Sequence, residues 1–343
     1  MTRRPPARKS PQAARFPALP MLDVYLPMMR CAAILCAGQL GLFQRLSRGE
    51  QTVAQLARGL RVDQASLTRL LAALRQAGYV QSSPSARWRN SQHTARWFTA
   101  AARVDYSAGL VWTAEAWTIM ADLAEVVRRG RPERRLWDLL HDRPELGARF
   151  SDYMRAFAEH ASPLIARHVV LPRHARHVLD IGGSHGLHSM TLCKKYPGLR
   201  ATILDDAAAL TCTLRLAKAH GLAGRIECQA GDCRTTPLPE ELDAVLLYGV
   251  AHNHTAAENR RLFARIGKAL RKKGQLIVHD YLPGAMPEDY RTLFDLTLLT
   301  EVGTRTYGLP EFQAWATAAG FGKLAVHHLD PKEMGTVLIG RRR

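Results

Sequence analysis

The chain has 343 residues, of which 47% are hydrophobic. A chain of this length and composition can bury one large core or two ordinary ones, which excludes a disordered or fibrous protein. Lysine and arginine number 48 against 30 acidic residues, which gives a net charge of +18. Eight of the basic residues lie in residues 1–20 and 341–343, where there is no acid. The charge alone raises nucleic acid, an anionic surface or an acidic ligand as partners without selecting one.

The cysteines and the hydrophobic runs indicate the compartment. The six cysteines form no CxxC pair and no metal-finger spacing, which favours thiols in a reducing cytoplasm over a disulfide framework. No hydrophobic run approaches the roughly 18 residues that a transmembrane helix needs. Five prolines among residues 1–20 disfavour a targeting helix there. We therefore expect a cytoplasmic protein with no membrane partner and a disordered basic tail over residues 1–20.

Short amphipathic helices dominate the region that follows this tail. The expected elements are two helices within 21–48, one over 51–60, one over 64–78 and a hairpin with its tip at 82–90. In the fourth helix, leucines recur at the spacing of one helical face: Leu67, Leu70, Leu71 and Leu74. Asp63 is suited to cap its first turn. Helix, turn, helix and hairpin in this order predict a winged helix-turn-helix.

Further helices are expected before the pattern changes near residue 176. One is predicted over 110–130, and another over 143–169 with an interruption at Pro163. Strands then alternate with helices, with strands at 176–183, 200–206, 225–232, 242–252 and 275–282, and helices at 189–196, 207–220, 258–273 and 310–321. This alternation predicts a parallel, doubly wound sheet. A final hairpin, with strands over 323–329 and 336–342, would add an antiparallel strand.

The first strand of this sheet ends in a glycine-rich turn, at the edge where doubly wound sheets bind ligands. Gly182, Gly183 and Gly186 lie in this turn, where glycine lets the backbone approach a ligand closely. Ser184 and Leu187 interrupt the GxGxxG fingerprint, which disfavours a pyrophosphate cofactor. The alternative interpretation is an ordinary strand-to-helix turn.

Acids end the next two strands. Asp205 and Asp206 are placed where a carboxylate can accept hydrogen bonds from both hydroxyls of a ribose, and Asp232 is placed to receive an exocyclic amine such as that of adenine. Asp205 and Asp232 could each instead cap the start of a helix. Together with the glycine turn, the two separate acidic sites suit an adenosine ligand without phosphates.

These motifs resemble those of the class I S-adenosylmethionine-dependent methyltransferases, in particular the plant-type small-molecule O-methyltransferases and their bacterial natural-product relatives. VLDIGGSHG resembles their nucleotide-binding loop, LDD the ribose-binding acid and GDC the adenine-binding turn. LTRLLAALRQAGYV resembles their N-terminal winged-helix dimerisation domain, and FSDYM the helix that reaches over the cofactor. The resemblance implies an α/β fold, a Rossmann-like doubly wound methyltransferase sheet with an N-terminal all-α winged-helix domain. It also implies a homodimer.

The resemblance implies an order of domains along the chain. The expected parts are a basic tail (1–20), a winged-helix dimerisation domain (21–102), substrate-pocket helices (103–170) and an S-adenosylmethionine-binding catalytic domain (171–343).

The resemblance also assigns cofactor contacts. The glycines Gly182, Gly183 and Gly186 would line the methionine side of S-adenosylmethionine, Asp205 with Asp206 would hold the ribose, and Asp232 and Cys233 would flank the adenine. Tyr248 stands where the family often has a lysine near the cofactor carboxylate. Ser184 replaces the usual middle glycine, which we expect the turn to tolerate with a negative φ.

His252, in YGVAHNH, stands where the family keeps its catalytic histidine. A neutral imidazole can take a hydroxyl proton near physiological pH, and such general-base help contributes about 10²- to 10⁴-fold. Asp280 stands where a family glutamate orients the histidine. Asn253 replaces the family's aspartate, and a second family glutamate has no counterpart among residues 303–307. A packed, structural histidine is the alternative.

The remaining candidates concern the acceptor and a metal. Apolar side chains on two predicted helices are candidates for the acceptor pocket or for simple core: Phe150, Met154, Phe157, Leu298 and Leu299. His252 and His254 have an HxH spacing, but no further ligand completes a convincing set, so no metal is expected.

The sequence thus predicts methyl transfer from S-adenosylmethionine to a hydroxyl of a small aromatic or polyketide-like secondary metabolite or pigment. Transfer to carbon or nitrogen, or a member of the family that moves no methyl group, is the alternative. A more distant alternative is a DNA-binding regulator, in which polar residues of 64–77 enter a major groove. The resemblance to a dimerisation domain disfavours nucleic acid as a partner.

Overall fold

The computed structural model describes residues 19–329 and 335–343, and it divides into two compact units between Ala114 and Glu115. Most of the expected basic tail and the turn at 330–334 lie outside the described residues. In the described part of the chain, no helix is both long and apolar enough to cross a membrane.

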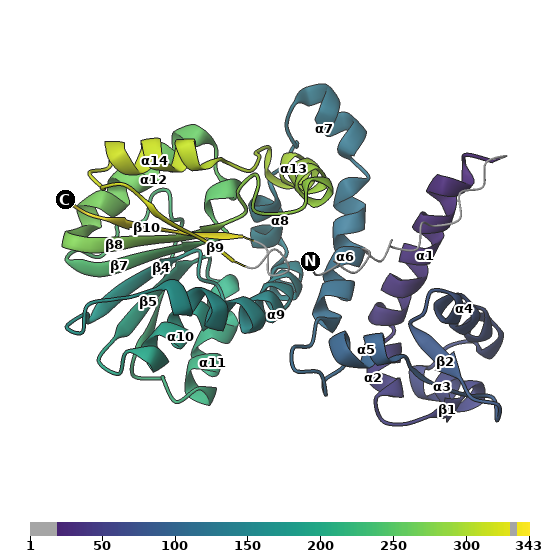
Figure 1. Cartoon of the computed structure of the whole chain (residues 1–343). Coiled ribbons are helices and arrows are strands. Elements are labelled where there is room, and N and C mark those ends of the chain that lie inside the picture. The colour runs from purple at the N-terminus through teal and green to yellow at the C-terminus, as the bar shows by residue number, and fades with distance from the viewer. Residues whose placement is uncertain (1–18, 330–334) are drawn as a thin grey trace, which may run out of the picture. The chain divides into compact units, whose positions relative to one another are not determined.

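The first unit is a winged helix (Figure 1). Its elements are α1 (Leu22–Gln39), α2 (Leu42–Leu46), β1 (Gln51–Thr52), α3 (Val53–Leu60), α4 (Gln64–Gln76), β2 (Val80–Ser82), β3 (Arg87–Asn90) and α5 (Gln92–Trp97). Asp63 caps α4 as predicted, since its Oδ1 accepts a hydrogen bond of 2.7 Å from Ser66 N. The buried face of α4 carries Leu67, Leu71 and Leu74. The return strand β3 lies within the predicted tip and pairs with both β1 and β2.

Helices connect this unit to the sheet. They are α6 (Ser107–Met120), which begins in the first unit, and α7 (Leu123–Arg129), α8 (Leu136–Asp142) and α9 (Pro144–His168). The predicted helix over 110–130 is therefore two helices. The predicted interruption at Pro163 is wrong, because α9 runs through it. Burial of Ala158, Ile165 and Ala166 on both sides of Pro163 holds the helix against the core despite the missing backbone donor.

The second unit contains the predicted doubly wound sheet. Among the described residues its seven strands have the order β6-β5-β4-β7-β8-β10-β9. They are β4 (His177–Ile181), β5 (Arg200–Asp205), β6 (Ile226–Ala230), β7 (Leu242–Tyr248), β8 (Leu270–Asp280), β9 (Ala325–His328) and β10 (Thr336–Arg341). Strands β4 to β8 are parallel, β10 pairs antiparallel with β8, and β9 pairs antiparallel with β10.

Helices cover both faces of this sheet (Figure 1). The connecting elements are α10 (Leu187–Lys195), η1 (Ala209–Cys212), α11 (Thr213–Ala219), η2 (Ala251–Asn253), α12 (Ala256–Ala269), α13 (Glu288–Val302) and α14 (Leu309–Ala318). Alternate residues of each strand enter two separate cores. Val178 and Leu246 pack with α9 to α11, whereas Leu179 and Leu247 pack with α12 and α14.

Strand β8 begins earlier than the sequence predicts. Residues 270–273 were expected to end a helix over 258–273, but α12 ends at Ala269 and Leu270 pairs with Leu242 of β7. The parallel strands bring the carboxyl ends of β4, β5, β6, β7 and β8 to one edge. The candidate site residues lie along this edge.

Candidate functional site

The glycine turn after β4 bends in conformations that other residues rarely adopt. Gly182 and Gly186 have φ values of 68° and 72°. A Cβ atom on Gly182 would lie 2.6 Å from Cγ2 of Val250, and one on Gly183 would lie 2.6 Å from Cγ of Asp180. Gly182 and Gly183 are therefore required by close packing against their neighbours, which leaves the turn without side chains of its own at these two positions.

Ser184 in the middle of this turn has a φ of 42°, so the expectation of a negative φ is wrong. Three contacts hold it in the left-handed region. Its N–H donates to Asp205 Oδ2 at 2.8 Å, its carbonyl oxygen accepts from Thr213 Oγ1 at 2.6 Å, and its Oγ lies 2.9 Å from Ser151 Oγ. These contacts offset the cost of a positive φ, which is about 1–2 kcal/mol for a residue with a Cβ.

Asp205, at the end of β5, faces the glycine turn. Its carboxylate accepts hydrogen bonds from the N–H groups of Ser184 at 2.8 Å and Asp206 at 2.7 Å. Burial raises the pKa of Asp205 to about 6. Each carboxylate oxygen keeps a further lone pair that could accept a hydrogen bond from a hydroxyl group. Asp206 is used differently, because its Oδ2 lies 2.9 Å from His141 Nδ1 on α8.

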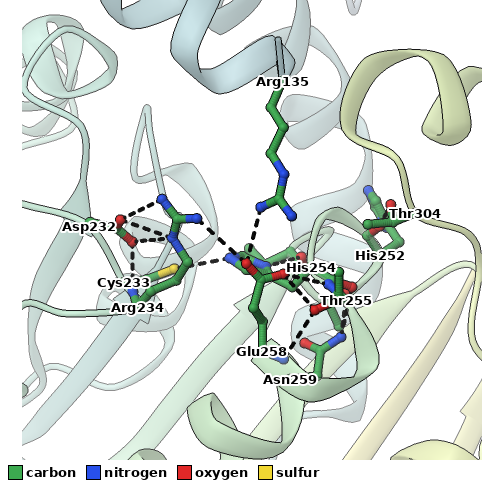
Figure 2. A network of polar contacts seen from close by, with 12 residues as sticks. Arg135, Asp232, Cys233, Arg234, His252, His254, Thr255, Glu258, Asn259 and Thr304 are labelled. Atoms are coloured by element: carbon green, nitrogen blue, oxygen red, sulfur yellow. Dashed lines mark hydrogen bonds and ion pairs between the residues drawn. The ribbon is translucent and has the colours of Figure 1, made fainter. Parts of the chain in front are cut away.

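Asp232, after β6, is held by Arg234, two residues further along the chain (Figure 2). The Nε of Arg234 donates to both oxygens of Asp232 at 3.1 and 2.9 Å. Burial acts to raise the pKa of Asp232, but the Arg234 contacts hold it below its usual value. The neighbouring Cys233 places its Sγ 3.5 Å from His254 Nε2. Since burial raises the pKa of Cys233 to about 12, this thiol is neutral and can donate to the imidazole.

Tyr248, at the end of β7, carries a buried polar atom without a hydrogen-bond partner in the described part of the chain. Its hydroxyl oxygen is shielded from solvent, and its ring packs edge-on to His188 at 4.7 Å. Burial raises the pKa of Tyr248 well above its usual value, so the phenol stays protonated. An unsatisfied buried donor is costly, and an acceptor atom of a bound ligand would satisfy it.

His252 and Asp280 form a buried pair where β7 and β8 end. His252 Nδ1 lies 2.7 Å from Asp280 Oδ1, and the His252 N–H donates to Asp280 Oδ2 at 3.3 Å. The side chains are 9% and 3% exposed. Burial acts to raise the pKa of Asp280, but His252 holds it below its usual value, so the carboxylate is ionised. In the neutral imidazole the proton therefore lies on Nδ1, and the lone pair lies on Nε2.

A second acid near His252 was missed in the sequence. Glu301, in the last turn of α13, is half-buried. Its burial raises its pKa to about 7, and the proximity of His252 acts in the opposite direction. Glu301 lies two residues before the range 303–307, where the resemblance led us to expect this acid. Its signal was a lone carboxylate in the apolar stretch LTLLTEV. Within residues 303–307, the hydroxyl of Thr304 donates to the His252 carbonyl oxygen.

Aromatic rings surround His252 and were also missed. Phe294 packs edge-on to the imidazole at 5.4 Å, and Tyr281 lies at 5.9 Å from it. Tyr290 stacks on Phe294 at 5.9 Å. On the same helix as Phe294, Leu298 is buried and Leu299 is half-buried. Phe294 and Tyr281 thus pack beside the imidazole, and Tyr290 extends this aromatic cluster through Phe294.

The other acceptor candidates lie on α9 and are half-buried: Phe150, Met154 and Phe157. Phe150 packs edge-on to Trp137 at 5.6 Å, and Phe157 to Tyr153 at 5.0 Å. These contacts are compatible with a pocket wall and equally with core packing.

Comparison with known families identifies the chain. The model of the O-methyltransferase domain family matches residues 120–322, which is more than half of the chain. The chain belongs to the O-methyltransferase family. The predicted family membership is thereby confirmed. A second family model, that of the bacterial regulatory proteins of the arsR family, matches residues 38–82 of this O-methyltransferase, within its winged helix.

Individual relatives agree with this assignment. The 3-hydroxy-5-methyl-1-naphthoate 3-O-methyltransferase of Streptomyces sahachiroi is 26% identical over 96% of both chains. The N,N-dimethyltransferase OxyT of Streptomyces rimosus is 26% identical over 80% of this O-methyltransferase and 81% of OxyT. The crystal structure of human N-acetylserotonin methyltransferase in complex with SAM superposes with a TM-score of 0.82 at 20% identity, covering 96% of this chain and 99% of the human one. The Rossmann-like fold is thereby confirmed.

Proposed function

We propose that this O-methyltransferase moves a methyl group from S-adenosylmethionine to a hydroxyl of a small aromatic secondary metabolite, with His252 as the general base. The observation that carries the proposal is the buried contact of 2.7 Å between His252 Nδ1 and Asp280 Oδ1. It fixes the tautomer of the imidazole and leaves Nε2 as the acceptor of a proton.

The residues along the sheet edge fit the proposed cofactor. Gly182 and Gly183 carry no side chain, which lets a ligand approach the backbone of the turn. Asp205 would accept hydrogen bonds from the ribose hydroxyls, and Asp232 with Cys233 would flank the adenine. The buried hydroxyl of Tyr248 offers a donor to the methionine carboxylate. When bound, S-adenosylmethionine supplies a methyl group already activated by its sulfonium.

The chain's own residues then handle the proton of the acceptor. His252 takes the hydroxyl proton at Nε2, and the ionised Asp280 stabilises the imidazolium that forms. Glu301, once ionised, adds a second negative charge near the same ring. The rings of Tyr281, Phe294 and Tyr290 provide apolar surface for a flat acceptor, so that its hydroxyl can be presented to His252.

A product analysis tests this proposal. The enzyme would be incubated with S-adenosylmethionine carrying a deuterated methyl group and with hydroxynaphthoates and matched aminonaphthoates as acceptors. The hydroxynaphthoates follow from the name of the Streptomyces sahachiroi relative, and the amines from that of OxyT. We expect the label as a methyl ether. A label found on nitrogen or ring carbon, with hydroxyls left untouched, would refute the role given to the hydroxyl.

We also propose a homodimer formed through the first unit, as the family resemblance implies. Five apolar side chains on one face of α1 and its start are 41–70% exposed: Met21, Val24, Tyr25, Met28 and Met29. Their spacing of three and four residues makes a continuous apolar stripe, and such a stripe is commonly covered by a partner. Light scattering after size exclusion should give a dimer.

A pair of charged substitutions tests this interface. Val24→Glu combined with Met28→Glu should yield a monomer, because two charges would have to be buried. Arg48→Glu, on an exposed residue outside α1, serves as the control and should leave the dimer intact. A wild-type monomer at micromolar concentration would contradict the proposal.

A further inference from the structure

Each end of helix α8 contacts a segment at the ligand-binding edge of the sheet. At its start, Arg135 donates from a terminal guanidinium nitrogen to Glu258 Oε1 at 3.1 Å. Near its other end, His141 Nδ1 lies 2.9 Å from Asp206 Oδ2. Glu258 belongs to the first turn of α12, next to His254, and Asp206 follows Asp205. Asp206 thus adjoins the acid assigned to the ribose, and Glu258 reaches the acid assigned to adenine, Asp232, through Arg234.

The contact at the start of α8 continues as a chain of alternating charges (Figure 2). Glu258 Oε1 lies 3.6 Å from a terminal nitrogen of Arg234, whose guanidinium holds both oxygens of Asp232. The order Arg135, Glu258, Arg234 and Asp232 is therefore positive, negative, positive and negative. Glu258 and Arg234 each contact two partners. The loss of Arg135 at one end should therefore alter the contacts of Asp232 at the other.

Glu258 is the most firmly held of these four charged residues. Its other oxygen accepts hydrogen bonds of 2.8 Å from the N–H and the hydroxyl of Thr255, which close a capping box at the start of α12. Burial acts to raise the pKa of Glu258, but the Thr255 and Arg135 contacts lower it to about 2. The carboxylate is therefore ionised and held in place. Its side chain is 13% exposed, against 30% for Arg135.

We propose that α8 is a strap over the adenosine end of the cofactor site, and that Arg135 is the positioning residue that fastens it and sets cofactor affinity. Without Arg135, Glu258 would draw Arg234 away from Asp232, and the carboxylate assigned to adenine would lose its fixed orientation. The start of α8 would be freed as well. Arg135 touches neither the methyl group nor the acceptor in this scheme, so its loss should weaken cofactor binding and leave the methyl-transfer step unchanged.

The experiment compares neighbouring arginines by calorimetry with S-adenosylhomocysteine, the demethylated form of the cofactor, which lacks the sulfonium charge. Arg135→Gln is the test, and Arg134→Gln is the matched control. Arg134→Gln removes the same charge one residue away, but the Arg134 guanidinium donates within α8, to the Asp138 carbonyl oxygen and to Asp142 Oδ2, and not to Glu258. We expect Arg135→Gln to raise the Kd about three- to tenfold, since the lost contact is charged but partly exposed. Arg134→Gln should bind as wild type does.

Kinetics separate positioning from a general structural role. Arg135→Gln should raise the KM for S-adenosylmethionine by a similar factor with an unchanged kcat, and Arg135→Lys should restore most of the affinity. His141→Gln, at the exposed end of the strap, should raise the Kd by about twofold. The inference is overturned if Arg135→Gln binds as tightly as wild type, or if Arg134→Gln weakens binding equally.

This inference rests on the proposed cofactor site, and the wild-type measurement distinguishes the two. If wild-type protein binds no S-adenosylhomocysteine, the proposed function fails. If wild type binds it and Arg135→Gln binds equally well, only the strap is refuted. Should Arg135→Gln fail to fold, His141→Gln keeps the test open, because a Kd equal to that of wild type would then overturn the strap.

Discussion

Replacing Asp280 by asparagine changes one charge at a position where both carboxylate oxygens are used. Oδ1 receives the Nδ1 proton of His252 and the N–H of Tyr281, and Oδ2 receives the His252 N–H. An amide cannot reproduce this pattern. If its oxygen faces Nδ1, its NH₂ group opposes the His252 N–H. If its NH₂ group faces Nδ1, the ring must place its proton on Nε2, and the base is lost.

The magnitude follows from the burial of the pair. Removing one partner of a buried, hydrogen-bonded charge pair costs about 3–5 kcal/mol. The imidazolium of His252 forms as the acceptor loses its proton, so this cost falls on the transition state. At about 1.4 kcal/mol for each factor of ten, Asp280→Asn should lower kcat by about 10²- to 10⁴-fold. This range equals the usual contribution of a general base.

The assay is methyl ether formation at saturating acceptor and cofactor, followed by mass spectrometry. Binding of S-adenosylhomocysteine should be unchanged, because Asp280 is assigned to the base and not to the cofactor. Asp289→Asn, an exposed carboxylate at the start of α13, controls for the general effect of the substitution. A fall in kcat of less than tenfold, with binding and folding intact, would refute the reasoning.

Three further outcomes follow from the site. Because ribose hydroxyls donate to an ionised carboxylate, affinity for S-adenosylhomocysteine should rise with pH through the pKa of Asp205 at about 6 and then level off, and Asp205→Asn should abolish this dependence in calorimetry between pH 5 and 8. Gly182→Ala should destabilise the protein by about 1–3 kcal/mol more than Gly221→Ala, because both have φ near 70° but only the former meets Val250; equal melting temperatures would contradict this. Burial raises the pKa of Glu301 to about 7, so the folded state binds its proton more tightly than the unfolded state does. Stability should therefore fall as pH rises from about 4.5 to 7, and Glu301→Gln should reduce that fall in thermal melts, whereas an identical fall would contradict the assignment.

The sheet and its ligand-binding edge were predictable because they follow from local patterns. Buried β-branched runs that alternate with amphipathic helices leave few topologies. The glycine turn and the acids at 205 and 232 end their strands, so their place at one edge follows directly. His252 and Asp280 likewise end neighbouring parallel strands. Their 2.7 Å contact is a consequence of that register.

Other features depend on contacts between distant segments, which one sequence does not reveal. Residues 270–273 have helical composition, but pairing with β7 draws Leu270 into the sheet. Pro163 interrupts a helix by local rules, whereas burial on both sides keeps α9 whole. The positive φ of Ser184 is supported by Asp205, Thr213 and Ser151, which lie on three other segments.

Glu301 was missed for a related reason. Its relation to His252 depends on how α13 packs across the end of β7, and residue spacing alone does not give that packing. The rings of Phe294 and Tyr281 come to His252 from α13 and from the end of β8 in the same way. The one local feature of the sequence that indicates Glu301 is a single carboxylate in an apolar stretch of predicted helix.

The central claim is that His252 takes the proton of the acceptor as the methyl group moves. The most direct measurement is the single-turnover rate of methyl ether formation by His252→Gln with cofactor and acceptor both bound. We predict a rate about 10²- to 10⁴-fold below that of wild type, with the Kd of S-adenosylhomocysteine unchanged. A His252→Gln enzyme that forms the ether at the wild-type rate would contradict the account.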